Sequence, residues 1–163
     1  MRYTLKTFFL LLGLSSFSMA QMMQMAKLVA GDAAIYDNFG RSVSISGDYK
    51  IVGAPNNDDG GSASGSAYIF IRDGTSWSQQ AKLVASDAAA EDFFGYTVSI
   101  SGDYAVVGAA YDDDGATDSG SAYTFVRSGT SWSQQAKLVA GDAYTNDQFG
   151  YSVSISGDYA VVG

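Results

Sequence analysis

The fold is decided by one stretch, AKLVASDAAAEDFFGYTVSISGDYAVVG at 81–108, which returns almost unchanged at 136–163. The two copies agree at 22 of 28 positions, and no gap is needed to align them. An earlier copy begins at Ala26, so the repeat interval is 55 residues. Self-similarity at a fixed interval of this order is typical of solenoids and propellers, whose units stack to bury a shared core.

Each unit has the two-residue periodicity of β-strands. In Val43-Ser44-Ile45-Ser46, apolar and hydroxyl side chains alternate, so one face of the strand is apolar and the other is hydroxylic. Turn-forming residues bound each such segment. We predict four antiparallel strands at about 41–46, 48–54, 66–72 and 76–85, repeated 55 residues later, and about ten strands in all. The predicted fold class is all-β, with propeller blades of four antiparallel strands.

Composition excludes several function classes. The 163 residues include no histidine and no cysteine, which excludes Ser-His-Asp and Cys-His catalysis, zinc-thiolate sites and disulfides. Seventeen acidic against nine basic residues give a net charge of -8, the wrong sign for a phosphate backbone or an anionic membrane surface. We therefore expect no nucleic-acid partner, and only oxygen ligands for any metal ion.

Residues 1–20 have the pattern of a secretory signal peptide. Arg2 and Lys6 precede an apolar run at 8–14, and the small-residue pattern Ser18-Met19-Ala20 is typical of a cleavage site. The run is too short to span a bilayer, which takes roughly 20 apolar residues. The prediction is a secreted or cell-surface protein with no membrane span after cleavage, in which 21–163 form a partial propeller.

Each unit opens with Phe-Gly and closes with a Gly-Ala-Pro-like segment: Phe39-Gly40 with Gly53-Ala54-Pro55, Phe94-Gly95 with Gly108, and then Phe149-Gly150. This pattern resembles the FG-GAP repeat of integrin-alpha-like β-propellers, and the Trp-centred fourth strand is similar to that of secreted bacterial FG-GAP proteins. The resemblance implies a ring of about seven blades, used for extracellular binding and often with calcium. Residues 21–163 hold about 2.6 units. We interpret them as an incomplete propeller from a truncated product or fragment; a ring built from several copies is the alternative.

The integrin-type calcium loop between the first two strands has no counterpart here. That connection is only Ser46-Gly47-Asp48, too short to wrap an ion that takes six to eight oxygens. We expect Asp48 to shape the hairpin by bonding nearby backbone.

In an up-and-down blade the long loops gather at one edge. Their acidic residues are the candidate ligand-binding residues: Asp58, Asp59, Asp112, Asp113, Asp114 and Asp118. The alternation of Asp112, Asp114 and Asp118 predicts a weak calcium site, with a solvated turn as the alternative. Two aspartates five residues apart precede each Phe-Gly motif, and in the second unit they are Asp87 and Asp92. This recurrence favours turn capping over metal binding.

Other prominent side chains are assigned structural positions. Phe39, Phe94 and Phe149 are expected to plug the core. Trp77 and Trp132 alternate with apolar neighbours and should pack between blades rather than stack on a ligand. Lys82 and Lys137 fall on the opposite face of the same strands, where we expect them to be solvated.

The favoured function is an extracellular binding or adhesion module that uses an acidic loop face to hold an extracellular protein or glycan. One alternative is the propeller scaffold of an enzyme whose catalytic residues lie in missing blades; another is a nonfunctional truncated product. We expect no enzyme activity, because no nucleophile–base pair is visible. Open blade edges also predict self-association.

Overall fold

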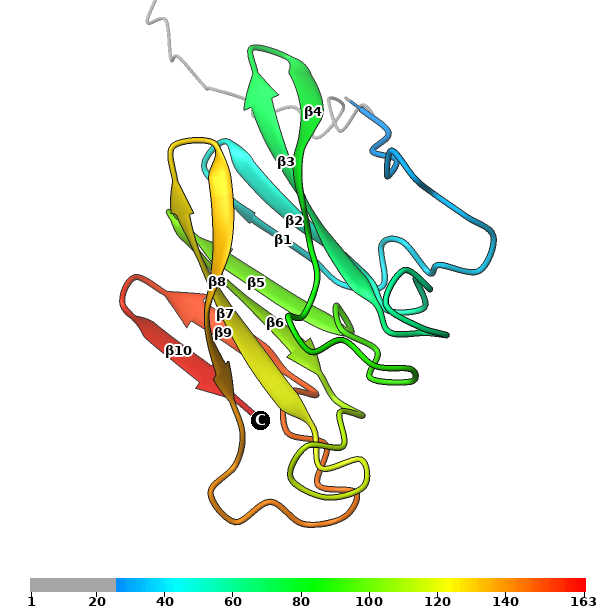
Figure 1. The fold of residues 1–163 in the computed structure, drawn as a ribbon. Helices are drawn as coiled ribbons and strands as arrows, with labels where there is room; N and C mark the ends of the chain where they lie inside the picture. The colour runs from blue at the N-terminus through cyan, green and yellow to red at the C-terminus, as the bar shows by residue number, and fades with distance from the viewer. Residues whose placement is uncertain (1–25) are drawn as a thin grey trace, which may run out of the picture.

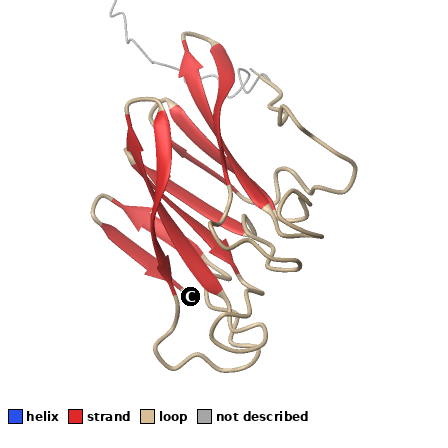
Figure 2. Cartoon of the chain, in the orientation of Figure 1, coloured by secondary structure: helices blue, strands red, loops and turns tan. Residues whose placement is uncertain are grey.

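The computed structural model describes residues 26–163, so the predicted signal peptide lies outside the described residues (Figure 1). Ten strands follow one another: β1 Val43–Ser46, β2 Tyr49–Ala54, β3 Ser66–Asp73, β4 Ser76–Leu83, β5 Thr97–Ser101, β6 Tyr104–Ala109, β7 Ser121–Ser128, β8 Ser131–Leu138, β9 Val153–Ser156 and β10 Tyr159–Val162. Figure 2 shows only strands and loops in this part of the chain. None of its residues forms a helix with the length and apolarity that a membrane crossing requires.

The strands form three antiparallel sheets, in the orders β1-β2-β3-β4, β5-β6-β7-β8 and β9-β10. The sheets stack side by side as an open array (Figure 1), which confirms the prediction of incomplete four-stranded blades. β1 begins two residues later than expected, because Arg41 N still donates to Asn38 O in a turn. β4 ends at Leu83, before a turn in which Ala88 N donates to Ala85 O.

The larger of the two hydrophobic clusters lies between the first and second sheets. Ile51 and Ile69 from the first sheet pack with Val98 and Phe125 from the second, and all four are buried. Phe94 is fully buried there and meets the ring of Tyr123 edge-on, with 5.3 Å between ring centroids. A second, smaller cluster includes Val52, Ala54, Tyr68 and Phe70 of the first sheet, with Leu28 and Phe39 of the preceding segment packed against it. Stacking of the sheets therefore supplies most, but not all, of the apolar burial.

The phenylalanines of the Phe-Gly motifs pack into the core as expected, but they differ in how deeply they are buried. The Phe39 ring packs edge-on against Tyr68 and Phe70, the equivalents of the rings that Phe94 contacts, but Phe39 is only partly buried. Phe149 is also partly buried. The difference arises because only Phe94 lies between two four-stranded sheets.

The two glycine motifs interlock neighbouring units. Gly95 N donates to Gly108 O at 3.0 Å, which joins the opening and closing motifs of one unit. The same glycine has a φ of +88°, and a Cβ placed on it would lie 2.3 Å from Ser66 O of the preceding unit. A Cβ on Gly53 would lie 2.0 Å from Gly95 O. Both positions therefore need glycine for close backbone approach, and Gly95 also for its left-handed φ.

Serines on the innermost strands join one sheet to the next. Ser44 Oγ accepts a hydrogen bond from Ile100 N at 3.3 Å, and Ser99 Oγ accepts one from Ile155 N at 3.1 Å. The remaining members of this serine ladder are Ser42 to Val98 N, Ser46 to Gly102 N and Ser101 to Gly157 N. The hydroxylic face predicted from the alternation therefore lies between two sheets. Its hydroxyls accept hydrogen bonds from amides of the next sheet that point away from their own sheet neighbour.

Trp132 packs between blades, as predicted. Its Nε1 donates to Gln80 Oε1 of the preceding sheet at 3.0 Å, and its ring lies 6.4 Å from that of Tyr49, centroid to centroid. The indole is therefore part of the inter-sheet packing.

Candidate ligand-binding edge

The loops separate by length. The two-residue hairpins that join β1 to β2 and β3 to β4 lie at one end of the sheets, and the long loops at 55–65, 84–96, 110–120 and 139–152 gather at the other end (Figure 2). We call this end the long-loop edge. It is the part of the fold where side chains from several units meet.

A lysine lies at the centre of the acidic residues of the second unit. Lys137 Nζ lies 2.8 Å from Asp87 Oδ2 and 2.9 Å from Asp112 Oδ2, and it also pairs with Asp114. The Lys137 side chain is 17% exposed and that of Asp112 is 4% exposed. We call these four residues the Lys137 cluster. The expectation that Lys137 is solvated is wrong.

A β-bulge explains this correction. Phe125 pairs with Gln134 while its neighbour Thr124 pairs with Ala136, so Gln135 is an extra residue in β8. The extra residue reverses the alternation of side chains beyond it. Lys137 consequently shares the face of Trp132 instead of lying opposite to it, and its ammonium reaches the acidic loops at the end of the strand.

The charges in this cluster stabilise one another. Burial acts to raise the pKa of the Asp112 carboxyl, but hydrogen bonds from Lys137, the Asp114 backbone and the Tyr123 hydroxyl outweigh burial and hold that pKa below its ordinary value. Burial acts to lower the pKa of Lys137, but hydrogen bonds to Asp114, Asp87 and Asp112 outweigh it and raise that pKa. Both partners are therefore ionised at neutral pH.

The first unit contains the same arrangement with one charge fewer. Lys82 Nζ lies 2.6 Å from Asp32 Oδ2 and 3.2 Å from Asn57 Oδ1, and it pairs with Asp59. Asn57 stands where the second unit has Asp112. We call this set the Lys82 cluster. Lys82 is also placed by a bulge, at Gln80, and the expectation that it is solvated is likewise wrong.

The donor set does not fit a calcium ion. One carboxylate oxygen each from Asp87, Asp112 and Asp114 lie within 4.8 Å of one another. Calcium takes six to eight oxygens, whereas this cluster offers few and already holds an ammonium. Of the predicted trio, the structure brings Asp112 and Asp114 together, with Asp87 in place of Asp118.

The remaining candidate residues shape the loops. Asp58 Oδ1 accepts from Ala63 N at 2.8 Å, and Asp113 Oδ1 accepts from Asp118 N at 2.7 Å. Asp58, Asp59 and Asp113 are exposed, and Asp118 is half-buried. The carboxylates of Asp58 and Asp113 therefore hold turns while they remain open to solvent.

The second of the two acids before each Phe-Gly caps a turn, as predicted, whereas the first one pairs with a lysine in the first two units, which corrects the capping prediction for Asp87. Asp92 Oδ2 accepts from Ala89 N at 2.7 Å, and Asp37 and Asp147 make the equivalent bonds. Asp92 is 5% exposed, and burial raises the pKa of its carboxyl to about 6. This group is consequently the carboxyl with the clearest response to mildly acidic pH.

An aromatic row on the same edge was not predicted. The Arg41 guanidinium lies 4.4 Å from the ring centroid of Tyr96, whose ring lies 5.1 Å from that of Tyr151 and 5.9 Å from that of Tyr111. Arg41, Tyr96 and Tyr151 each follow a Phe-Gly motif. Their shared place in the repeat was the available signal, because equivalent positions of stacked units lie side by side.

Two acids of the opposite edge pair with arginine. Asp48 Oδ1 accepts from Arg72 at 2.5 Å, and Asp103 pairs with Arg127 in the same way. The expectation that Asp48 bonds its own turn is therefore wrong, because the end of β3 brings a guanidinium beside it.

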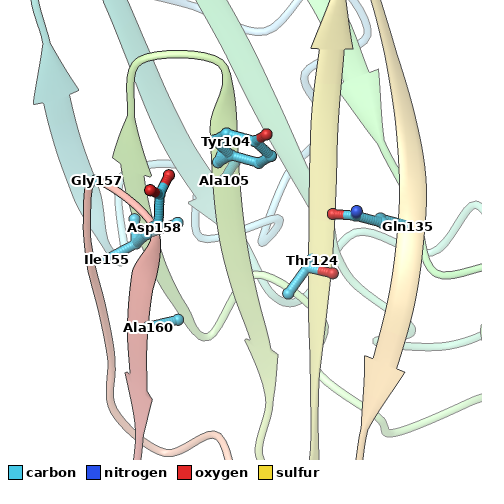
Figure 3. A pocket seen from close by; sticks show the side chains of 8 residues that line it. All are labelled: Tyr104, Ala105, Thr124, Gln135, Ile155, Gly157, Asp158 and Ala160. Carbon is cyan, nitrogen blue, oxygen red and sulfur yellow. The ribbon is translucent and has the colours of Figure 1, made fainter.

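A groove of about 250 Å³ lies between the second and third sheets (Figure 3). Thr124 and Gln135 line it from the second sheet, and Ile155, Asp158 and Ala160 line it from the third. The equivalent face of the first sheet is covered by β7 and β8, and the third sheet has only two strands. The groove is thus an uncovered part of an inter-sheet face.

A model of the FG-GAP repeat matches the chain three times, over residues 22–70, 77–125 and 132–163. Each of the last two matches begins in the Trp-containing strand of one sheet and continues into the next sheet. The sequence repeat is therefore offset by one strand from the structural blade. No curated protein matches the sequence.

Proposed function

Because the chain belongs to the FG-GAP repeat family, we propose that it is an extracellular or cell-surface binding module that contacts its ligand through the long-loop edge. The observation that carries the proposal is the charge of the Lys137 cluster, in which three carboxylates share one ammonium. An excess of carboxylate on one edge of a rigid array attracts a cationic partner. The partner that fits best is an extracellular protein with exposed lysine or arginine side chains.

The exposed loop acids support this assignment. Asp113 and Asp118 lie beside the Lys137 cluster in sequence, and Glu91 lies in the preceding loop; Asp113 and Glu91 are exposed and Asp118 is half-buried. On the opposite edge, Asp48 and Asp103 each pair with an arginine. Asp73 and Asp158 are the exposed acids of that edge without an arginine partner among the described ion pairs. The clustering of acids at the long-loop edge favours it as the acidic face, and binding rather than catalysis as its use.

The test compares two pairs of acids with a matched charge change. The double variant Asp113→Asn, Asp118→Asn changes the long-loop edge, and Asp73→Asn, Asp158→Asn changes the hairpin end. The probe is an oligolysine peptide, with oligoglutamate as the negative control, titrated at low and physiological salt. The proposal expects the first double variant to lose several-fold in affinity and the second to match the parent. Equal losses in both, or no binding by the parent, would refute the proposal.

The extracellular half of the proposal is tested separately. Expression with the native first twenty residues in a secreting bacterial host should yield culture-medium protein whose first residue is Gln21. Retention of the full-length chain inside the cell would contradict secretion without bearing on the oligolysine result.

A further inference from the structure

Within the segment that all three units share, the repeats differ most at the tip of one loop. Of the 28 positions in 26–53, 81–108 and 136–163, 18 have the same residue in every unit. Three positions have a different residue in every unit, and all three lie in the loop before the Phe-Gly motif. Two of these are adjacent, and we call the residues there the tip pairs: Ile35-Tyr36, Ala90-Glu91 and Thr145-Asn146.

The tip pairs are open to solvent in every unit. Ile35 and Tyr36 are 82% and 86% exposed, and the two other pairs are also exposed. The second unit has a sheet on either side of it (Figure 1), and Ala90 and Glu91 are exposed there as well. The exposure is therefore a property of the loop and does not depend on an end of the array.

The backbone below the tips is the same in each unit. Tyr36, Glu91 and Asn146 have φ of +77°, +70° and +66°, in the left-handed region that glycine adopts most freely. The loop is also anchored to the preceding unit, because Glu91 N donates to Ser62 O at 2.8 Å and Asn146 N donates to Thr117 O at 2.9 Å. One fixed backbone thus presents three different side chains.

This combination points outward from the chain. A loop that only connects two strands would be least strained with glycine at the left-handed position, whereas each unit keeps a side chain there and each keeps a different one. Variable side chains on a rigid scaffold are typical of surfaces that recognise a partner. The chemistry also changes from one tip pair to the next: apolar and aromatic, then acidic, then hydroxyl and amide.

We infer that the tip pairs determine which ligand the long-loop edge selects, and that the ligand is a protein segment with an apolar side chain beside its basic ones. The inference rests on the proposed function, since it concerns the same edge. Glu91 adds a carboxylate that favours a basic side chain, while Ile35 and Tyr36 offer an apolar surface that favours an apolar one. Because equivalent positions of stacked units lie side by side, one ligand segment can contact both tip pairs.

Two peptides of equal charge test the inference: an oligolysine, and a peptide with the same number of lysines and with tryptophans between them. The measured quantity is the ratio of the two affinities, tryptophan-containing peptide over oligolysine, from calorimetric titration at physiological salt. Since both peptides carry the same charge, the ratio reports apolar contact at the edge and not its total charge.

Two tip variants should move this ratio in opposite directions. Glu91→Tyr should raise it about tenfold, the gain expected from covering much of one aromatic side chain, and Tyr36→Glu should lower it by a similar factor. Neither substitution adds backbone strain, because tyrosine and glutamate already occupy this φ in the first and second units.

Asp73→Tyr is the matched control, because it exchanges an exposed acid for tyrosine at the hairpin end, and it should leave the ratio unchanged. A ratio that keeps the parent value in both tip variants, or that rises equally in Asp73→Tyr, overturns the inference, while oligolysine binding by the parent still supports the proposed function. A parent that binds neither peptide refutes the proposed function and the inference together.

Discussion

Lys137 Nζ lies 2.9 Å from the buried carboxylate of Asp112, in a position where an acidic loop would otherwise need an external cation. The lysine comes from a strand and the aspartate from a loop, and they are 25 residues apart. The Lys82 cluster repeats this relationship with Asn57 in place of the aspartate. The two clusters therefore have the same geometry, but only the Lys137 cluster contains the buried negative charge.

Lys137→Met should destabilise the protein by about 3 kcal/mol, because it leaves the buried Asp112 carboxylate without its cation. Lys82→Met should cost only about 1 kcal/mol, because its carboxylate partners are partly exposed and Asn57 is neutral. Urea unfolding followed by tryptophan fluorescence measures both. Equal costs in the two variants would show that the buried charge is not the cause.

Gly95→Ala should cost more than about 3 kcal/mol. The new Cβ would lie 2.3 Å from Ser66 O, in addition to the strain of a φ of +88°. Gly40→Ala is the matched control, since its φ of +95° is similar but its Cβ would meet nothing within 4 Å. It should cost about 1–2 kcal/mol. Thermal unfolding with equal losses would mean that the interlocking of glycine motifs adds nothing beyond backbone strain.

Ser44→Ala should cost about 1–2 kcal/mol, because it removes the acceptor of the partly buried Ile100 amide between the first two sheets. Ser154→Ala, at the same place on an exposed strand, should be neutral when unfolding is measured at a concentration below association. Hydrogen exchange of the Ile100 amide offers a direct readout, with faster exchange expected only in Ser44→Ala. Unchanged protection would show that the serine hydroxyls do not hold these amides.

Asp92 should make stability fall as pH rises from about 4 to about 6. Its carboxyl has an ordinary pKa of 3.8 when unfolded and a pKa of about 6 when folded, so the folded state binds the proton more tightly in this window. Above pH 6 the buried group is ionised and its cost is fully present. Asp92→Asn should remove this decline, since an amide oxygen can still accept from Ala89 N. A parent and variant with parallel stability profiles between pH 4 and 6 would contradict the assignment.

The strands and their order were predictable because their signals are local. Alternation at Val43 to Ser46 and the 55-residue repeat each need only the sequence of one unit. The hydroxylic face was also visible, although its partners were not. Pairing of Ser44 with the Ile100 amide depends on how two sheets stack, which no pattern within one strand records.

The lysine clusters could not be predicted from the alternation of side chains along the strand, because one bulged residue reverses that alternation. With Gln135 bulged out, Lys137 moves to the face of Trp132. The bulge leaves no mark in a sequence that reads as a continuous strand. Asp112 and Asp114 were identified as acidic loop residues, but Asp87, which completes their cluster, was assigned to a turn.

Lysine, rather than a metal ion, holds the acidic loops in this structure. Thermal unfolding of the parent and of Lys137→Met, each with millimolar calcium and with a chelator, tests this assignment. We expect the same melting temperature for the parent under both conditions, and a rise with calcium in Lys137→Met, whose three carboxylates have lost their ammonium. Calcium stabilisation of the parent that disappears in Lys137→Met would contradict it.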